Sequence, residues 1–240
     1  MQRAVICLPT YDERENLEPM VRALEAVLDT SQDRVLVIDD SSPDGTGELA
    51  DRLAADLPWV SVLHRERKEG IGPAYVAGFR KALEDGATLI LEMDCDFSHD
   101  PGDVPRLIAA SREADLVLGS RYVAGGGTEN WGLVRRFVSR AGCLYAQVLL
   151  GVRVRDLTGG FKCFRHEALE AVDLDALSAH GYAFQIETTY RVLRAGLPVQ
   201  EVPIRFVERR AGASKMTGAI VAEAIWKVPL LRLRALTGRL

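Results

Sequence analysis

The sequence contains few cysteines, and their spacing matches no metal-binding or disulfide-rich pattern. Cys7, Cys95, Cys143 and Cys163 form no CxxC pair and no spacing typical of zinc ligands. We therefore expect neither a disulfide framework nor a structural zinc site. Unpaired thiols of this kind fit a reducing, cytoplasmic environment.

Long apolar runs and an excess of positive charge are also missing. The first residues, Met1-Gln2-Arg3, lead directly into a short apolar segment, without the hydrophobic core and cleavage site of a signal peptide. Charged residues interrupt the apolar stretches well before the roughly 20 residues that a membrane-spanning helix needs. The formal net charge of -4 argues against a general nucleic-acid binder, which has a broad basic face. Any site for an anion must therefore be local.

The sequence does contain enough apolar residues for a substantial core. Its 240 residues, 48% of them hydrophobic, suit one α/β domain. Apolar segments of strand length alternate with segments of helical periodicity. This order predicts a doubly wound, mostly parallel sheet with ligands at the carboxyl ends of its strands. The expected strands are residues 4–8, 35–38, 60–63, 88–93 and 116–118, and the expected helices cover 17–28, 49–57 and 76–83.

The second half of the chain is less regular. The strict alternation stops after Gly119, and the glycines at 125–127 indicate a mobile loop before a helix over residues 134–150. A further strand is expected over 199–206, because Gly196-Leu197-Pro198 is a helix-stop signal. We expect this strand to join the same core.

A polar loop over residues 8–16 follows the first expected strand. The Tyr11 side chain could stack on a ring of a ligand, and the Glu13 carboxylate could bind its polar edge. Asp12 and Glu13 are also favourable at the start of a helix, where a carboxylate interacts well with the helix dipole. Taken alone, this loop favours the helix start.

The second expected strand ends in two carboxylates, Asp39 and Asp40. A carboxylate at this edge of a sheet can accept hydrogen bonds from the N–H of a base or from a ribose hydroxyl. Further along the same segment, Asp44 or Thr46 is expected to cap the next helix.

The fourth expected strand leads into Asp94-Cys95-Asp96. Alternate residues of an extended chain point to the same side, so Asp94 and Asp96 could share a cation. Mg²⁺ or Mn²⁺ binds one or two carboxylates together with phosphate oxygens, so the protein need not supply a full set of ligands. We expect Asp100 to cap the turn at Pro101, and His99 to be an ordinary solvated or capping residue.

Basic residues suited to phosphate are scattered through the second half. Arg121 directly follows an expected buried strand, and Arg135 and Ser139 are four residues apart on one helix face, so one phosphate could meet all three. Arg209 and Lys215 flank a Gly- and Ser-containing turn that could close over a diphosphate. Other basic residues, such as Arg136 and Arg210, are expected to be solvated surface charges.

Taken together, these segments resemble the family 2 glycosyltransferases, and within them the polyprenol-phosphate (dolichol-phosphate) mannose synthases. The resemblance covers nearly the whole chain and rests on several blocks in the order of the family. The blocks are Leu8-Pro9-Thr10-Tyr11-Asp12-Glu13-Arg14-Glu15-Asn16, Asp39-Asp40-Ser41-Ser42-Pro43-Asp44-Gly45-Thr46, Asp94-Cys95-Asp96, Gly119-Ser120-Arg121-Tyr122 and Ser214-Lys215-Met216. The family usually has Ala at the position of Cys95.

The resemblance implies a GT-A fold, a GDP-mannose donor, Mg²⁺ or Mn²⁺ as cofactor and a polyprenyl phosphate acceptor. It also implies a division of the single domain, residues 1–240, into a nucleotide-sugar-binding half (about 1–120), an acceptor half (about 121–218) and an amphipathic C-terminal helix (219–240). The residue roles transfer by position. Pro9, Tyr11, Glu13, Val37 and Asp39 match the guanosine pocket; Asp94, the backbone of Cys95 and Asp96 match the diphosphate and metal site; Arg121, Arg135 and Ser139 match the acceptor-phosphate site; Arg209 and Lys215 match the loop that closes on the donor.

The expected reaction is direct displacement at the anomeric carbon with inversion. A phosphate monoester is largely dianionic at neutral pH, since its second pKa is near ~6, and it needs no general base. Asp96, Arg121 and Lys215 are the expected catalytic residues. Glu187 would be the base if the acceptor were a sugar hydroxyl; the alternative is that it pairs with a nearby arginine.

The C-terminal segment 219–240 has an apolar helical stripe and a net charge of +3, from four basic residues and one acidic residue. A helix lying on a membrane has this pattern, and so does a helix packed on the core with a basic tail. A lipid acceptor favours the membrane. We therefore expect a protein peripheral to the cytoplasmic face of a membrane, with contact made directly or through a membrane-protein partner, and no nucleic-acid partner.

Two other functions fit the same residues. One is a glucosyltransferase that moves glucose from UDP-glucose to a polyprenyl phosphate, because strand-end carboxylates alone do not choose guanine over uracil. The other is a non-catalytic nucleotide-binding subunit of a membrane glycosylation complex. The presence of Asp94, Asp96, Arg121 and Lys215 argues against the second.

Overall fold

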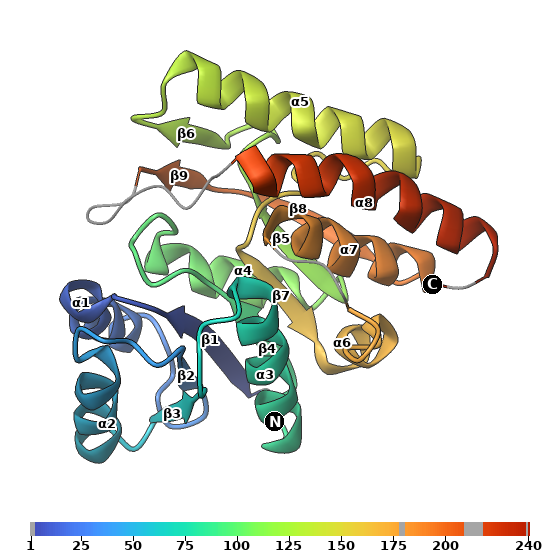
Figure 1. Ribbon diagram of the computed structural model, residues 1–240. Helices are drawn as coiled ribbons and strands as arrows, with labels where there is room; N and C mark the ends of the chain where they lie inside the picture. Colours follow the sequence, from blue (N-terminus) through green and yellow to red (C-terminus); the bar gives the residue numbers. More distant parts are fainter. Residues whose placement is uncertain (1–2, 178–180, 209–217, 239) are drawn as a thin grey trace.

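In the computed structural model, residues 3–177, 181–208, 218–238 and 240 are described, and they build two sheets (Figure 1). The larger has seven strands in the order β3-β2-β1-β4-β7-β5-β8, and the smaller pairs β6 with β9. The strands are β1 (Ala4–Thr10), β2 (Arg34–Asp39), β3 (Val60–His64), β4 (Leu89–Glu92), β5 (Leu116–Ser120), β6 (Gly127–Glu129), β7 (Lys162–Arg165), β8 (Val199–Pro203) and β9 (Arg205–Val207).

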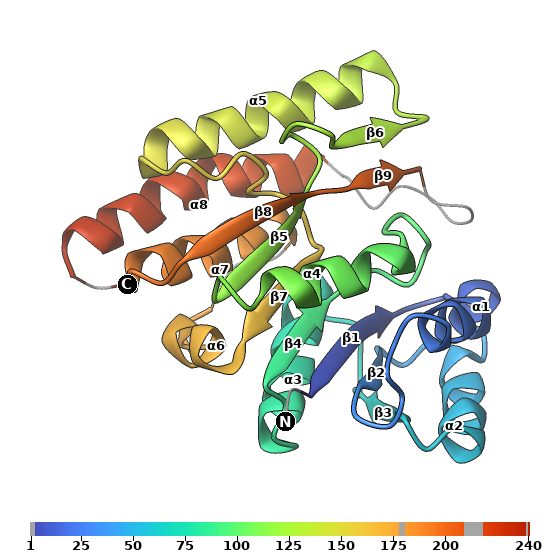
Figure 2. The ribbon, with the colours of Figure 1, turned by 180° about the vertical axis from the view of Figure 1, so that it is seen from behind.

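Helices cover both faces of the large sheet, as the two opposite views show (Figure 1, Figure 2). Helices α1, α2 and α4 pack on one face, and α3, α6 and α7 pack on the other, with α5 and α8 beyond α7. The helices are α1 (Arg14–Glu25), α2 (Thr46–Asp56), α3 (Ile71–Glu84), α4 (Val104–Ala110), α5 (Leu133–Leu150), α6 (His166–Val172), α7 (Gly181–Arg194) and α8 (Gly218–Leu236).

The strands lack polar alternation because the sheet is covered on both sides. In β1, Val5 and Cys7 lie in one core while Ala4, Ile6 and Leu8 lie in the other. Each side chain therefore needs to be apolar, whichever face it meets. The expected doubly wound, mostly parallel sheet and its first five strands are confirmed, with boundaries that differ by at most two residues.

Two features of the sheet differ from the expectation. The short strand β7 was not predicted, and it runs antiparallel between β4 and β5. The late strand expected over 199–206 is wrong as one unit, because β8 ends at Pro203 and the chain passes into β9 of the small sheet. The change of sheet falls at a proline, which has no N–H for a ladder hydrogen bond.

Strand β7 was not predicted from hydrophobicity because its first residue, Lys162, is charged and yet completely buried. Its ammonium lies 3.3 Å from the equally buried Glu92 of β4. It also donates hydrogen bonds to the side chain of Gln185 (2.5 Å), to the backbone carbonyl of Gln185 (2.9 Å) and to Thr188 (3.1 Å) in α7. A buried charge is tolerated when it is paired and hydrogen-bonded in this way.

The four cysteines form no disulfide, and all four are buried, which the sequence had not predicted. Among the helices of the described residues, none combines the length and apolar character that a membrane span requires.

The glycines at 125–127 serve a tight turn that leads into β6. A Cβ on Gly126 would lie 2.5 Å from the carbonyl oxygen of Ser120 and 3.0 Å from the carbonyl carbon of Arg121. The chain therefore folds back closely on the segment that carries Arg121, and only glycine fits there. Gly127, the next residue, has nothing within 4 Å of an added Cβ. The expected mobility of this loop stays a prediction.

This contrast gives a matched pair of variants. We expect Gly126→Ala to lower the free energy of unfolding by about 1–3 kcal/mol, because the added methyl group meets rigid backbone. Gly127→Ala should change it by less than about 0.5 kcal/mol. Urea unfolding of both variants measures the difference, and equal midpoints would contradict the close approach at Gly126.

Candidate active site

The carboxyl ends of β1, β2 and β4 meet at one edge of the sheet, and the loop after each strand contains a non-glycine residue with a positive φ. Asp12, Ser41 and Phe97 have φ values of 57°, 59° and 60°. Non-glycine residues seldom adopt this left-handed conformation, and for a residue as bulky as Phe97 it is a clear outlier. Strained backbone of this kind concentrates at functional sites, so the three loops mark the candidate site.

The first two loops are tied together by hydrogen bonds. The backbone N–H of Glu13 donates to Thr46 Oγ1 at 3.1 Å, and that of Arg14 donates to Asp44 Oδ2 at 3.1 Å. Asp44 Oδ1 also accepts from the N–H of Thr46 at 3.0 Å, at the first residue of α2. The N-cap position itself is Gly45, which has no side chain, so the expected cap by Asp44 or Thr46 is replaced by this hydrogen bond from the preceding residue. The loops thus form one wall of the site.

Asp39 is buried against this wall. Its Oδ1 accepts a hydrogen bond from Ser42 Oγ at 2.6 Å, and a Cβ on Gly47 would lie 2.9 Å from its Oδ2. The glycine at the start of α2 thus gives the carboxylate its room. Nearby, the ammonium of Lys68 lies 3.6 Å from the centre of the Tyr11 ring.

Two other residues of the expected guanosine pocket lie deeper in the sheet. Val37 is completely buried in the core beneath α1 and α2, and Pro9 is partly buried near the end of β1. Their contact with a base stays a prediction.

The motif Asp94-Cys95-Asp96 lies in a turn, because β4 already ends at Glu92. The expectation of an extended chain there was wrong. Cys95 and Asp96 are buried and Asp94 is partly buried. Asp96 Oδ1 accepts from the N–H of Ser98 at 3.0 Å, and the hydroxyl of Tyr75 lies 3.4 Å from Asp94 Oδ1.

The two carboxylates at this turn suit a hard divalent cation that takes its remaining ligands from a bound phosphate or from water. Within residues 3–177, 181–208, 218–238 and 240, no cluster of three or more His, Cys, Asp or Glu side chains could hold a metal. Two carboxylates completed by diphosphate oxygens are the arrangement that Mg²⁺ uses with nucleotides. The residues present therefore fit a metal whose remaining ligands come from the phosphate oxygens of a bound molecule.

His99, expected to be a solvated or capping residue, is not solvated, and its ring accepts a backbone N–H. It is buried, its ring stacks on Phe161 with centroids 4.9 Å apart, and the edge contact to Phe206 is 5.3 Å. The N–H of Asp94 donates to His99 Nδ1 at 3.2 Å, which requires that this nitrogen carry no proton. Burial lowers the pKa of His99 to about 4, so the ring is neutral near pH 7. By contrast, Asp100 caps the following turn as expected, accepting from the N–H of Gly102 at 2.8 Å.

Arg121 forms the most complete ion pair of the site. Its Nε and Nη2 donate to the two carboxylate oxygens of Asp156 at 2.7 and 2.6 Å, and its backbone N–H adds a third bond at 2.9 Å. Asp156 is completely buried. Burial alone would raise the pKa of Asp156, but the charge and hydrogen bonds of Arg121 hold it below its usual range.

Arg135 and Ser139 lie on the face of α5 that is turned toward the segment carrying Arg121. Ser139 Oγ accepts from the Tyr122 hydroxyl at 2.7 Å, and the Arg135 guanidinium lies 4.1 Å from the Trp131 ring centre. The shared face was correctly predicted. The sequence did not predict that Arg135 also contacts both carboxylate oxygens of Glu208.

One aromatic ring connects the carboxylate side of the site with this basic side. Phe206 of β9 contacts His99, which accepts the Asp94 N–H, and lies 5.6 Å from the Arg121 guanidinium. The small sheet therefore places one ring in contact with His99 and near Arg121. Arg209 and Lys215 follow β9 but lie outside the described residues.

Glu187 is bound to a neighbouring arginine. Its Oε1 accepts from Arg191 Nη2 at 2.9 Å and Nε at 3.1 Å, and both side chains are buried. The structural alternative considered for Glu187 is confirmed.

Comparison with known proteins places the chain in a family. A model of glycosyl transferase family 2 matches residues 5–173, and the chain belongs to this family. It is 49% identical to an undecaprenyl-phosphate mannosyltransferase of Micrococcus luteus over 94% of this chain and 92% of that one. It is 47% identical to a polyprenol monophosphomannose synthase of Mycolicibacterium smegmatis over 95% and 86%.

A solved structure confirms the expected GT-A fold. Glucosyl-3-phosphoglycerate synthase of Mycobacterium tuberculosis, crystallised with Mn²⁺, UDP-glucose and phosphoglyceric acid, superimposes with a TM-score of 0.71 at 19% identity. The alignment covers 96% of this chain and 80% of that one. At this identity the likeness concerns the fold.

The Arg121–Asp156 pair predicts how stability responds to mutation and pH. We expect Asp156→Asn to lower the free energy of unfolding by about 3–5 kcal/mol at pH 7, because Arg121 then stays buried without its counter-charge. Glu129→Gln, at an exposed pair with Arg205, should cost less than about 1 kcal/mol.

The contribution of the Asp156 carboxylate is present above its unfolded-state pKa, near ~4, and is lost as the pH falls through its lower folded-state pKa. Wild-type stability should therefore fall in this acidic window, and the Asp156→Asn variant should lack that part of the decline. Urea unfolding from pH 7 to pH 3 measures both effects. A variant with an unchanged pH profile would contradict the pairing.

Proposed function

We propose that the protein transfers mannose from GDP-mannose to a polyprenyl monophosphate, with inversion at the anomeric carbon. Its high identity over nearly the full length to a mannosyltransferase and a monophosphomannose synthase supports this donor sugar and acceptor. The observation that carries the proposal is the position of Phe206. Its ring contacts His99, which accepts the Asp94 N–H, and lies near the Arg121 guanidinium, so a carboxylate turn suited to a nucleotide diphosphate is close to an arginine suited to a phosphate.

The chemistry needs little from a general base. The acceptor monoester is largely dianionic at neutral pH, because its second pKa is near ~6, so its own oxygen attacks the anomeric carbon while GDP leaves. Arg121, Arg135 and Ser139 orient the acceptor phosphate. A bound Mg²⁺ or Mn²⁺ supplies positive charge that stabilises the leaving diphosphate, and Asp94 and Asp96 would hold that ion. The crystallisation of the structural relative with Mn²⁺ and a nucleotide sugar supports such a metal.

The nucleotide is proposed to lie along the wall formed by the first two loops. Tyr11, Glu13 and Asp39 supply a ring and carboxylates for the base and ribose, with Pro9 and Val37 behind them. The Cys95 backbone approaches the diphosphate. Arg209 and Lys215 are proposed to contact the leaving group. Neither alternative function is favoured by a feature of the structure.

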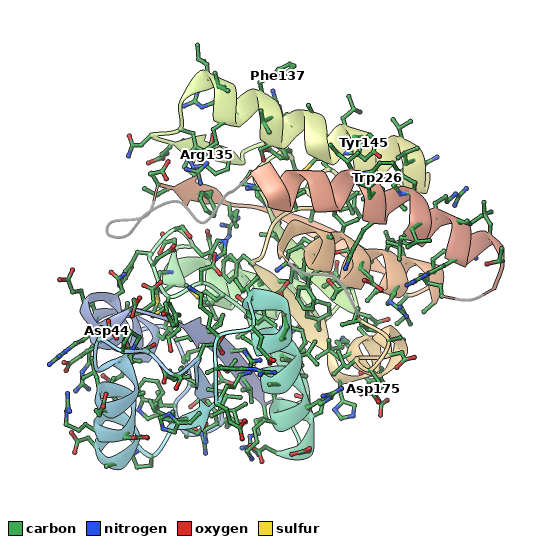
Figure 3. The ribbon with its side chains drawn as sticks, viewed as in Figure 1. Asp44, Arg135, Phe137, Tyr145, Asp175 and Trp226 are labelled. Atoms are coloured by element: carbon green, nitrogen blue, oxygen red, sulfur yellow. The ribbon has the colours of Figure 1, made fainter. Side chains whose placement is uncertain are left out.

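The surface of α5 supports contact with a lipid bilayer. Five large apolar side chains on this helix are exposed: Leu133, Val134, Phe137, Leu144 and Val148. Figure 3 shows Phe137 pointing away from the molecule, while Arg135 of the same helix points toward β9. The helix contains three arginines and no acidic residue, which suits an anionic membrane surface.

Helix α8 extends this apolar surface. Val228, Leu231 and Ala235 pack on the core, so the core-packing reading of the C-terminal segment is correct for them. Ile225, Trp226 and Leu233 are exposed. We propose that α5 and α8 rest on the cytoplasmic face of a membrane, so that the acceptor reaches Arg135 and Ser139 from the lipid.

The reaction is tested with labelled GDP-mannose and a series of lipid monophosphates, with and without a chelator. We expect transfer that stops on chelation and returns when Mg²⁺ or Mn²⁺ is added. Asp96→Asn should reduce the rate at least about 100-fold, since it weakens the metal site without changing side-chain volume. Wild-type rates for this variant would exclude the metal role of Asp96, and no transfer to any lipid phosphate would exclude the reaction.

Donor choice is tested separately by thermal unfolding with metal present. A ligand that binds only the folded state raises the melting temperature, so GDP-mannose should raise it and UDP-glucose should not. The opposite order would support the glucosyltransferase. Protection by GDP-mannose without any transfer would support the non-catalytic subunit.

Membrane contact is tested by flotation with vesicles that contain an anionic lipid. Replacing Phe137 and Val148 together with Ser should reduce the bound fraction about tenfold or more, because two exposed apolar side chains are lost. Ile71→Ser on α3 is the matched control and should bind like wild type. Unchanged binding of the double variant would contradict the proposal. Binding that needs an added membrane protein would point to a partner instead.

A further inference from the structure

The two arginines proposed to bind the acceptor phosphate are already paired with carboxylates, but the pairs differ. Asp156 is completely buried, and the N–H of the same residue donates to Glu201 at 2.9 Å, so its loop is anchored as well. Glu208 has a side chain that is 34% exposed, and its partner Arg135 is 22% exposed. Removing Asp156 from Arg121 would leave a buried charge unpaired, whereas Glu208 can leave Arg135 and be solvated.

The Glu208 pair also leaves hydrogen-bonding capacity unused. Both carboxylate oxygens of Glu208 meet the same nitrogen of Arg135, Nη1. Arg135 Nε is buried and has no hydrogen-bond partner among the described residues. The ring of Trp131 stacks under the Arg135 guanidinium. Its indole N–H is also buried and has no hydrogen-bond partner among the described residues. Buried donors without acceptors are costly, so this region favours a better acceptor than the carboxylate.

We propose that Glu208 is an internal competitor of the acceptor phosphate, which must displace its carboxylate from Arg135 to bind. The proposal rests on the proposed function, since it assumes that Arg135 receives the acceptor. A phosphate monoester brings three terminal oxygens and a charge near −2, against two oxygens and −1 for Glu208. It therefore wins the exchange and can also accept from donors such as Arg135 Nε and the Trp131 indole.

This exchange gives Glu208 a role in specificity. A ligand with a single negative charge has no electrostatic advantage over the carboxylate that it must replace, so the pair disfavours carboxylates and phosphodiesters. It also keeps Arg135 paired when no acceptor is bound. Glu208 acts through Arg135 and is a positioning residue.

The decisive variant is Glu208→Gln, which keeps the shape of the side chain and removes its charge. We expect the KM for a short polyprenyl monophosphate to fall about three- to five-fold, as for loss of a partly exposed ion pair. The donor KM and kcat should stay within about two-fold. The inhibition constant of inorganic phosphate against the acceptor should fall in parallel. Glu208→Asp, which retains the charge, should restore values near wild type.

Glu129→Gln is the matched control, because Glu129 ends β6 beside β9 and forms an exposed pair with Arg205. It should leave the acceptor KM unchanged. An acceptor KM that is unchanged or raised in Glu208→Gln would overturn competition and assign Glu208 a supporting role. An equal fall in both variants would show a general charge effect and would also overturn it.

The proposal can fail separately from the proposed function. Direct titration of wild type and Glu208→Gln with inorganic phosphate tests the exchange without any sugar transfer. If no lipid phosphate accepts mannose but phosphate binds more tightly to the variant, the function fails and the competition stands. If transfer occurs but the variant binds phosphate no better, the competition alone is wrong.

Discussion

Glu92 and Lys162 meet in the middle of the large sheet without access to solvent, and the geometry of the site depends on that meeting. The pair joins β4, which leads to Asp94, to β7, which lies antiparallel between β4 and β5. Once β7 is fixed there, Phe161 stacks on His99, and the segment just before it delivers Asp156 to Arg121. A charged pair in a core gains little stability by itself, but it allows few registers. Here the register decides which loop meets the turn that contains Asp94 and Asp96.

The large sheet also fixes the position of the small sheet. Strand β9 begins only two residues after β8 ends, so the position of Phe206 is fixed by the large sheet through Pro203. Its partner β6 follows the tight turn at Gly126, which lies against the backbone of Ser120 and Arg121. The elements around Arg121 therefore form one connected unit. The unit ends at Glu208, whose N–H bonds the carbonyl of Glu129.

The parts of this arrangement that were predictable are those that depend on local pattern. A buried parallel strand produces an apolar run in the sequence, so β1 to β5 were predicted. Residues four apart share a helix face, so the common face of Arg135 and Ser139 was predicted as well. Strand β7 was not, because a buried lysine looks like surface until its partner in another strand is known. The environment of His99 was missed for the same reason: its neighbours Phe161 and Phe206 are distant in sequence. Asp156 and Glu208 gave no signal, since a carboxylate that pairs across such distances looks like any other.

The paired arginines also bear on how an acidic protein could hold the proposed phosphate site. Because Arg121 and Arg135 are each matched by a carboxylate, these two pairs add almost no net charge, and their long-range attraction of anions is weak. Affinity must then come from exchange at close range, where a phosphate offers more acceptor atoms than the group it replaces. An anion with the same charge as the Glu208 carboxylate would gain nothing by replacing it, whereas an anion of higher charge would bind. Because Asp156 is buried and anchored while Glu208 is partly exposed, the proposed exchange concerns Arg135 alone and leaves the Arg121–Asp156 pair in place.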